Sequence, residues 1–361
     1  MQATFGDDLV KTRFFTVGER AGRWWFMTPD GNPVFSIGLN HIDSAPLRYP
    51  EQESLWSDRY GNSQERWLRD RVTADLRAWG FNTVGWTQEV VVLGSAESPV
   101  DRHSRNFTFE EYQWLGLYYC HMLPFAEIHQ WDAQTPYPDV FASVFEEWCD
   151  YVARSECGRM ADDPKLIGYF FSDCPTWAHI SLHYPTKKPW FDPDALQAPS
   201  GRRELARTAE KYYRTITEAI RRYDPNHLIL GDRYEGKALV PEEVLRAAAP
   251  YVDVLSFQYF SDAQTIRRDF NRWHAQTGKP VLLADACVPD PADAGAPQRY
   301  ASMMRALRET TCCVGWHYCG AYLKNRSRRR GLRDESDKID EPMVSAMTEV
   351  NHEIHRWVKG F

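Results

Sequence analysis

The chain alternates short, nearly continuous apolar runs with longer segments in which apolar residues recur every three or four positions. Runs of the first kind predict strands buried on both faces, and segments of the second kind predict amphipathic helices. Eight strands are predicted in this way, at residues 34–39, 81–86, 116–125, 166–171, 227–234, 252–260, 280–287 and 313–322. Helices are predicted between most of these strands, and a last helix is predicted over residues 342–357.

Local signals mark where some of these elements begin and end. Asn62, with Glu65 three residues later, forms a capping-box pattern at the start of the first helix, and Gly80 ends that helix. Near the N-terminus, Asp30 and Gly31 predict a hairpin turn between two strand-like runs.

Eight strands alternating with helices favour a (β/α)8 TIM barrel of the α/β class, preceded by a short N-terminal β-hairpin. No linker-like break interrupts the pattern, so residues 1–361 are predicted to form one catalytic domain. An open doubly wound sheet is the alternative. However, the first strand is not followed by the glycine-rich turn that would bind a nucleotide.

Composition narrows the choice of partners and compartment. The net charge of −7 does not favour nucleic acid, and no apolar run approaches the roughly 20 residues of a membrane span. The eight cysteines lack CxxC or zinc-ribbon spacing and are interpreted as reduced thiols. No signal peptide is visible, so a cytoplasmic protein is expected, although a secreted protein trimmed of its signal would look the same. A homo-oligomer is compatible with the sequence.

Polar and aromatic residues lie together at the ends of the predicted strands, where barrel enzymes place their chemistry. Hydroxyl groups of a sugar need paired donors and acceptors, and the C–H face of a sugar ring stacks on aromatic rings, so this mixture predicts a sugar site. The residues predicted to bind substrate are Asn40, His41, Trp86, His121, Trp177, Asp232, Arg233, Tyr259, Trp316 and His317. Glu235 and Gln258 also lie at strand ends.

Two competing kinds of enzyme lack their sequence patterns. A metal hydrolase needs clustered ligands, but the first strand ends only in "NHID", and His121 and His317 are isolated along the chain. A GxSxG serine nucleophile motif is absent. No metal and no cofactor is therefore expected.

Two carboxylates on opposite strands are the minimum for glycoside hydrolysis. Asp173 and Asp285 end the fourth and seventh strands, which lie across a barrel from each other. Each could instead cap the following helix. The predicted function is hydrolysis of an O-glycosidic bond in an oligosaccharide or polysaccharide. The alternative is a barrel that binds carbohydrate without turnover.

Four segments together resemble the β-agarase-like glycoside hydrolases of clan A. They are "GRWWFMTPDGNPVFSIGLNHI", "LIGYFFSD", "GKPVLLAD" and "RGLRDESDKIDEPMVSAMTEVNHEIHRW", and the resemblance covers most of the chain. It implies a (β/α)8 barrel, a retaining mechanism and an agar-like or related galactan as substrate. It also implies an acid/base Glu in an Asn-Glu pair ending strand four, and a nucleophile Glu ending strand seven.

This sequence departs from that pattern at both catalytic positions. Asp173 falls on the Asn, Cys174 on the acid/base Glu, and Asp285 on the nucleophile. Either Asp173 is the acid, with its pKa raised by burial beneath Trp177 and by the charge of Asp285, or position 174 has lost its acid. Cys174 has no neighbouring His in sequence that would make it a nucleophile. Two Asp carboxylates would also lie further apart than two Glu carboxylates, which leaves inversion open.

A basic loop follows strand eight. The sequence "RSRRRGLR" could bind a sulfated or carboxylated sugar, or it could be a solvated face balanced by the acids after it. Its arginines are Arg326, Arg328, Arg329, Arg330 and Arg333.

Overall fold

The structure is a computed structural model. It describes residues 12–52, 54–94, 99–126, 137–180, 188–238, 240–288, 293–326 and 331–361.

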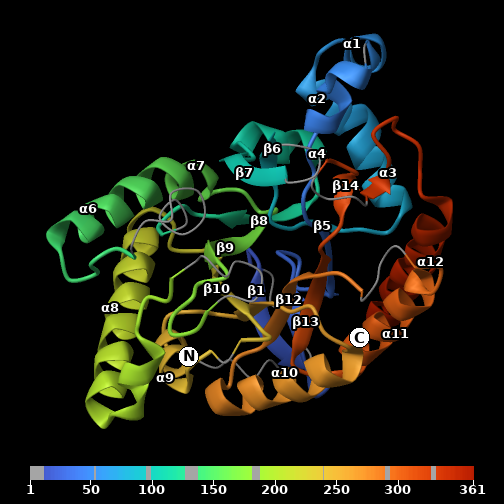
Figure 1. Ribbon diagram of the computed structural model, residues 1–361. Helices are drawn as coiled ribbons and strands as arrows, with labels where there is room; N and C mark the ends of the chain where they lie inside the picture. Colours follow the sequence, from blue (N-terminus) through green and yellow to red (C-terminus); the bar gives the residue numbers. More distant parts are fainter. Residues whose placement is uncertain are drawn as a thin grey trace.

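Eight parallel strands close into a barrel, as the sequence predicted, and helices surround it (Figure 1). Neighbouring strands follow the chain order around the barrel, and the last strand pairs with the first. The strands are β4 (Ser36–Leu39), β5 (Thr83–Val84), β8 (Tyr118–Met122), β9 (Leu166–Asp173), β10 (Leu228–Glu235), β11 (Leu255–Gln258), β12 (Val281–Ala286) and β13 (Cys313–Tyr318). Continuous apolar runs form these strands because a barrel strand is buried on both faces.

The long helices form an outer ring, with α6 and α8 on one side and α11 and α12 on the other (Figure 1). The major helices are α3 (Thr73–Ala78), α6 (Ser143–Val152), α8 (Pro199–Tyr223), α9 (Glu242–Ala248), α10 (Ala263–Thr277), α11 (Ala296–Glu309) and α12 (Glu341–Val358). The structure also contains α1 (Leu55–Tyr60), α2 (Gln64–Arg66), α4 (Phe109–Leu115) and α7 (Gly158–Met160). Each predicted helix is confirmed, with small differences at its ends.

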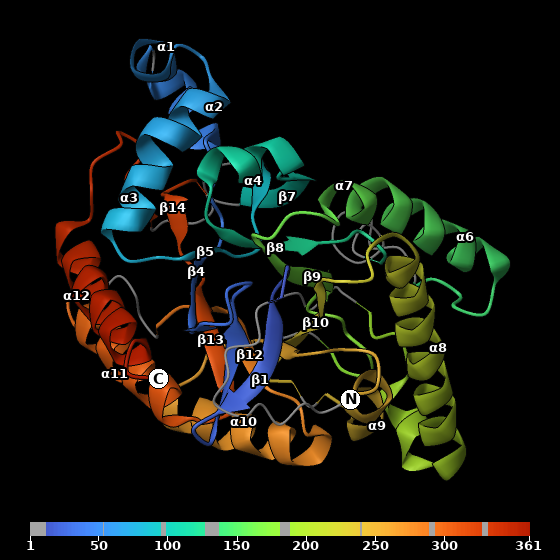
Figure 2. The same ribbon diagram turned by 180° about the vertical axis from the view of Figure 1, so that it is seen from behind.

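A three-stranded antiparallel sheet closes the N-terminal end of the barrel. It consists of β1 (Thr16–Arg20), β2 (Arg23–Met27) and β3 (Pro33–Val34), and β1 lies in front of the barrel strands in Figure 2. Phe15 and Phe26 belong to the same apolar cluster as Ile167 and Leu228, which lie in the first two positions of β9 and β10. The side chain of Arg23 donates to the carbonyl oxygens of Arg308 and Cys313, 2.6 and 2.7 Å away. The strand starts are thereby covered, so we place the site at the opposite end, the C-terminal mouth where the parallel strands end.

Two local predictions have different outcomes. The turn at Asp30 and Gly31 is confirmed, because β2 and β3 pair across it and Gly31 has a φ of +80°. The cap at Asn62 is wrong. The side chain of Ser63 accepts the backbone N–H of Arg66 as the cap of α2, while Asn62 has a φ of +60° after the left-handed Gly61.

Several elements were not predicted. Between β5 and β8 the chain forms the antiparallel hairpin β6 (Gln88–Gly94) and β7 (Pro99–Asn106), followed by α4. β14 (Ala321–Leu323) pairs with β15 (Gly331–Arg333) after the last barrel strand. A π-helical turn at Trp67–Val72 lies within a predicted helix, and another at Ala153–Cys157 extends the helix predicted from residue 141 to residue 152.

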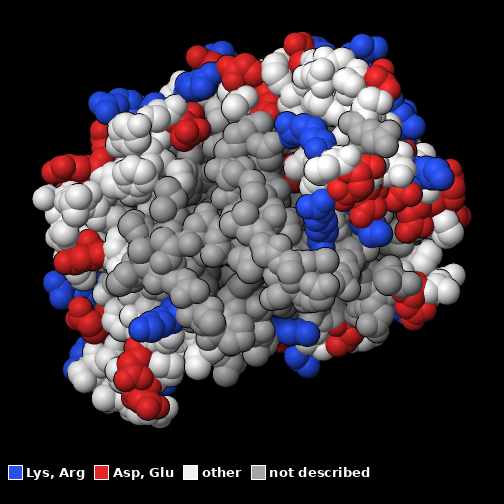
Figure 3. All heavy atoms as spheres, turned by 45° about the horizontal axis from the view of Figure 1, so that its top comes forward, with Lys and Arg blue, Asp and Glu red and all other residues white. Residues whose placement is uncertain are grey.

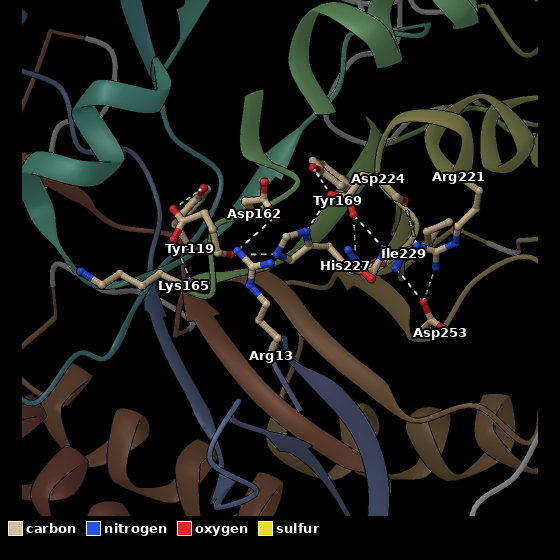
Figure 4. Close-up of polar contacts among 12 residues, drawn as sticks. Arg13, Tyr119, Asp162, Lys165, Tyr169, Arg221, Asp224, His227, Ile229 and Asp253 are labelled. Carbon is tan, nitrogen blue, oxygen red and sulfur yellow. Dashed lines mark hydrogen bonds and ion pairs between the residues drawn. The ribbon is translucent and has the colours of Figure 1, made fainter. Parts of the chain in front are cut away.

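A buried polar cluster fixes the starts of β9 and β10, away from the mouth (Figure 4). Asp224 follows α8 and lies 2.6 Å from Nδ1 of His227, and the hydroxyl of Tyr169 donates to the same carboxylate at 2.6 Å. Burial alone would raise the pKa of Asp224, but these hydrogen bonds and the charge of His227 lower it. The cluster satisfies buried polar groups between α8 and the barrel, so we assign it a structural role.

The cysteines and helices agree with two composition-based expectations. All eight cysteines are free, and six of them are buried. Among the helices of the described ranges, none is both long and apolar enough to cross a bilayer.

Candidate active site

The central residue of the mouth is Arg233 on β10. A bulge at Gly231, which has a φ of +66°, shifts the register of β10 against β9. After this bulge Asp232 faces α8, while the guanidinium of Arg233 lies 4.7 Å from the ring of Trp86 and 5.7 Å from that of Phe170, inside the barrel. A non-glycine residue at 231 would be strained by its positive φ and would meet Val252.

The guanidinium of Arg233 bridges the two carboxylates that the sequence singled out. Nη2 lies 2.8 Å from Oδ2 of Asp285, and Nη1 lies 3.3 Å from Oδ1 of Asp173. All three side chains are at most 2% exposed. Burial alone would lower the pKa of Arg233, but the charges of Asp173 and Asp285 raise it. Arg233 is therefore a fixed cation between two acids.

Asn40 holds the second oxygen of Asp285. Its Nδ2 donates to Oδ1 of Asp285 at 2.7 Å and to the carbonyl oxygen of Ala284 at 3.0 Å. Asn40 follows β4 and Asp285 lies near the end of β12, so three barrel strands position this one carboxylate. One oxygen accepts a hydrogen bond from Asn40 and the other pairs with the guanidinium of Arg233, which fixes the orientation of the carboxylate.

The shared guanidinium also limits the distance between the two acids. The Nη atoms of one planar guanidinium are about 2.3 Å apart, so the two bridged oxygens lie at most about 8 Å apart. Retaining glycosidases need about 5–5.5 Å and inverting ones about 6.5–9.5 Å between carboxyl groups. The limit admits the retaining distance and the shorter part of the inverting range.

The environment of Asp173 differs from the prediction. The sequence led us to expect Asp173 beneath Trp177 and beside an uncompensated Asp285. Instead Arg233 lies between the acids, and the ring of Trp177 stacks on Trp190 with a centroid distance of 4.5 Å. A neighbouring cation favours the ionised form of a carboxyl group, which is unfavourable for a proton donor.

Cys174 has a left-handed backbone, with a φ of +48°. Its N–H donates to the carbonyl oxygen of Arg233 at 2.9 Å, and its buried thiol donates to Oε1 of Gln258. A positive φ in a residue other than glycine is strained and is found mostly where the surrounding structure imposes it. An amide oxygen cannot act as the base that a thiol nucleophile needs.

His317 lies inside the barrel as a neutral side chain. Its Nε2 is 2.9 Å from the hydroxyl of Ser36, and its ring packs against Gly38 so closely that a Cβ there would lie 2.4 Å away. Burial, helped by the charge of Arg233, lowers the pKa of His317 to about 3. His317 thus contributes a fixed dipole near Arg233.

This neutral histidine makes a prediction about pH dependence. Between its ordinary pKa of 6.5 and about 3, the unfolded chain binds a proton that the folded chain does not, so stability falls as the pH falls through this range. In His317→Gln this contribution is absent. The loss of unfolding free energy between about pH 7 and pH 4.5 should be smaller by about 2–3 kcal/mol than in the original protein. Urea unfolding at both pH values measures it, and equal losses in the two proteins would contradict it.

Five residues predicted to bind substrate instead contact the helices around the barrel. They are His121, Trp177, Asp232, Tyr259 and Trp316. Asp232 accepts hydrogen bonds from Ser172 at 2.7 Å and from Tyr213 of α8 at 2.5 Å, and burial raises its pKa although these bonds lower it. His121 lies 3.5 Å from Glu156.

The aromatic members of this group are packed in the same way. Tyr259 donates to Asp269 of α10 at 2.5 Å, and its ring packs against Trp273 of the same helix. Trp316 stacks on Tyr300 of α11 with a centroid distance of 4.7 Å and is 1% exposed. Side chains alternate between the two faces of a strand, so a residue near a strand end can face the helices rather than the mouth.

The sequence reasoning did not single out Glu235 as a functional residue. It ends β10, pairs in register with Gln258 and is 1% exposed. Its Oε2 lies 3.5 Å from Nε2 of His179, whose side chain is 10% exposed. The available signal was the period of two, because residues 233 and 235 of one strand share a face.

One group of side chains at the mouth could hold a metal ion. Within the ranges that the structure describes, His41, Asp285 and Cys319 each offer a ligand atom, and these atoms lie within 4.8 Å of one another. The spacing of these residues along the chain did not predict such a group.

Comparison with known proteins adds to this geometry. No family model matches the chain. Over 172 residues it is 22% identical to β-agarase B of Vibrio sp. strain JT0107, which is 42% of this chain and 18% of that protein. An agarase structure has a TM-score of 0.70 at 18% identity, covering 98% of this chain and 65% of that one. An exo-β-agarase has a TM-score of 0.73 at 16% identity, covering 99% and 67%.

The chain shares the agarase fold. The resemblance to β-agarases in the sequence motifs is therefore confirmed at the level of fold. These relatives are longer than the part that this chain matches. The match spans less than a fifth of β-agarase B and about two thirds of each of the two agarase structures. Catalytic roles for Asp173, Cys174 and Asp285 remain predictions.

Proposed function

We propose that this chain is a glycoside hydrolase that cleaves O-glycosidic bonds in an agar-like galactan or its oligosaccharides. The observation that supports this most strongly is the carboxylate of Asp285, which Asn40 and Arg233 hold at the C-terminal mouth of a barrel with the agarase fold. The substrate class comes from the relatives, which are a β-agarase, an agarase and an exo-β-agarase.

Asp285 would act on the anomeric carbon, either by attacking it or by activating water. Such a carboxylate must be ionised and correctly oriented. Arg233 supplies a counter-charge 2.8 Å from one oxygen of Asp285, and Asn40 fixes the plane of the carboxylate. Arg233 would also balance part of the negative charge of the site before substrate binds.

Two carboxyl groups are candidates for the proton donor. Asp173 is the predicted acid, but its ion pair with Arg233 opposes protonation. Glu235 is buried two residues after Arg233, and its Oε2 lies 3.5 Å from Nε2 of His179, a residue that could pass a proton to it. We therefore propose Glu235 as a second candidate for the acid.

Natural and activated substrates distinguish these two acids. Purified protein is assayed on agar oligosaccharides and on an aryl galactoside, and NMR of the first product gives retention or inversion. One of the two substitutions, Asp173→Asn or Glu235→Gln, removes the proton donor. That variant should lose about 10²–10⁴-fold in turnover of the natural substrate and much less in turnover of the aryl galactoside. If Cys174→Glu instead produces a large gain, position 174 has lost its acid. The absence of galactoside cleavage under all conditions would contradict the proposed activity.

One observation supports a second candidate function, carbohydrate binding without turnover. Arg233 pairs with both Asp173 and Asp285, and a thiol occupies the position where the resemblance implies an acid/base. Binding of agar oligosaccharides by calorimetry, without any product after long incubation, would favour this function.

The structure also bears on whether the sugar is charged. Arg326 pairs with Glu51 at 2.7 Å, and the buried Arg333 pairs with Asp75 at 2.7 Å. The other three arginines of the basic loop lie outside the described residues. Among the described residues on the face shown in Figure 3, acidic and basic side chains are interspersed. Since Arg326 and Arg333 already have acidic partners, we propose that these two arginines do not bind a sulfate group of the substrate.

A further inference from the structure

We infer that His41, Cys319 and Asp285 form a binding site for one thiophilic divalent cation of the Zn²⁺ type at the barrel mouth. Imidazole, thiolate and carboxylate are the three kinds of side chain that bind zinc in proteins. The site is additional to the hydrolytic role proposed above, and its occupation would regulate that role.

The distances fit this ion. Sγ of Cys319 lies 3.7 Å from Nε2 of His41. A tetrahedral zinc ion with bonds of about 2.3 Å to sulfur and about 2.0 Å to nitrogen separates these atoms by about 3.5 Å. The carboxylate oxygen of Asp285 completes a triangle in which no side exceeds 4.8 Å, so a small movement of the side chains brings all three ligands into range.

The backbone holds two of the ligands in place. His41 has a φ of +58°, its N–H donates to the carbonyl oxygen of Trp86 at 3.2 Å, and its own carbonyl oxygen accepts from Tyr322 at 3.1 Å. The N–H of Cys319 donates to the carbonyl oxygen of Ala286 at 2.9 Å. Because neighbouring strands fix both residues, binding orders little additional chain.

The charges also balance. Binding releases the thiol proton of Cys319 to solvent, so a thiolate and the carboxylate of Asp285 match the two charges of the cation. Asp173 remains as the partner of Arg233, and the guanidinium therefore keeps a counter-charge when Asp285 turns to the metal.

Three protein ligands leave one position of a tetrahedral ion for water. With Asp285 coordinated, its carboxylate is no longer available to the anomeric carbon. Zinc should therefore inhibit hydrolysis, and this consequence alone rests on the proposed function.

Cobalt(II) is the probe, because its bonds to thiolate absorb in the near-ultraviolet and its tetrahedral complexes absorb in the visible. Titration of the full chain should show one saturable site with both features, and Zn²⁺ should displace the Co²⁺. Cys319→Ser should remove the thiolate band and weaken zinc binding at least about tenfold. His41→Asn, which keeps a residue type that tolerates a positive φ, should weaken it similarly.

Cys287→Ser is the matched control, because Cys287 is also partly exposed, follows the neighbouring strand β12 and lies outside the group. It should leave the spectrum and the zinc affinity unchanged. No saturable cobalt binding, or a thiolate band that persists in Cys319→Ser, would overturn the inference.

The spectrum does not depend on turnover, so the two proposals fail separately. If the protein hydrolyses the substrate but does not bind the metal, only the proposed metal site is refuted. If the protein binds the metal but does not hydrolyse the substrate, only the proposed activity is refuted.

Discussion

Asp285→Asn should lower turnover at least about a thousandfold while the protein remains folded. Asn has nearly the shape of Asp but cannot attack the anomeric carbon or act as a base. The fold should persist because Arg233 retains Asp173 as its counter-ion. Initial rates on agar oligosaccharides and a thermal melt of the same sample measure both effects.

Asp269→Asn is the matched control for this substitution. Asp269 is also a buried carboxylate, but it lies on α10 and accepts the hydroxyl of Tyr259. This variant should keep its turnover even if its melting temperature falls. Near-original turnover in folded Asp285→Asn would refute the role of Asp285.

Arg233→Met should lower the free energy of unfolding by about 3–5 kcal/mol at pH 7, because it leaves two buried carboxylates without their cation. Protonation would remove the charges of these unpaired acids. The folded variant should therefore bind more protons than its unfolded chain. The deficit in its free energy of unfolding relative to the original protein should shrink as the pH falls toward about 5. Urea unfolding at both pH values measures the deficit.

Arg326→Met is the control, because the ion pair between Arg326 and Glu51 is about half exposed and screened by solvent, so its loss should change the free energy of unfolding little. A deficit for Arg233→Met that is no larger than that of Arg326→Met, or that grows as the pH falls, would show that the bridge does not balance the two acids.

The barrel could be predicted because its strands are buried on both faces. Runs such as Leu166–Asp173 and Val281–Ala286 are apolar almost throughout, and the stripe of α8 recurs with the helical period. The hairpin of β6 and β7 lies outside the barrel and was not predicted, although β6 includes the short apolar run of residues 90–93. The cap at Ser63 was missed because Asn62 and Ser63 are both good capping residues.

The sequence by itself determined the barrel and the chemical groups at its mouth, because strand burial and the order of the chain are local properties. The sequence pattern placed Asp173, Arg233 and Asp285 at the ends of predicted strands. Only the tertiary structure decided which of these groups meet. The bulge at Gly231 turns Arg233 inward and Asp232 toward α8, and this choice sets the bridge between the acids. Such contacts join residues more than 50 positions apart, and their side-chain directions follow from strand register and packing, which the chain order alone does not specify.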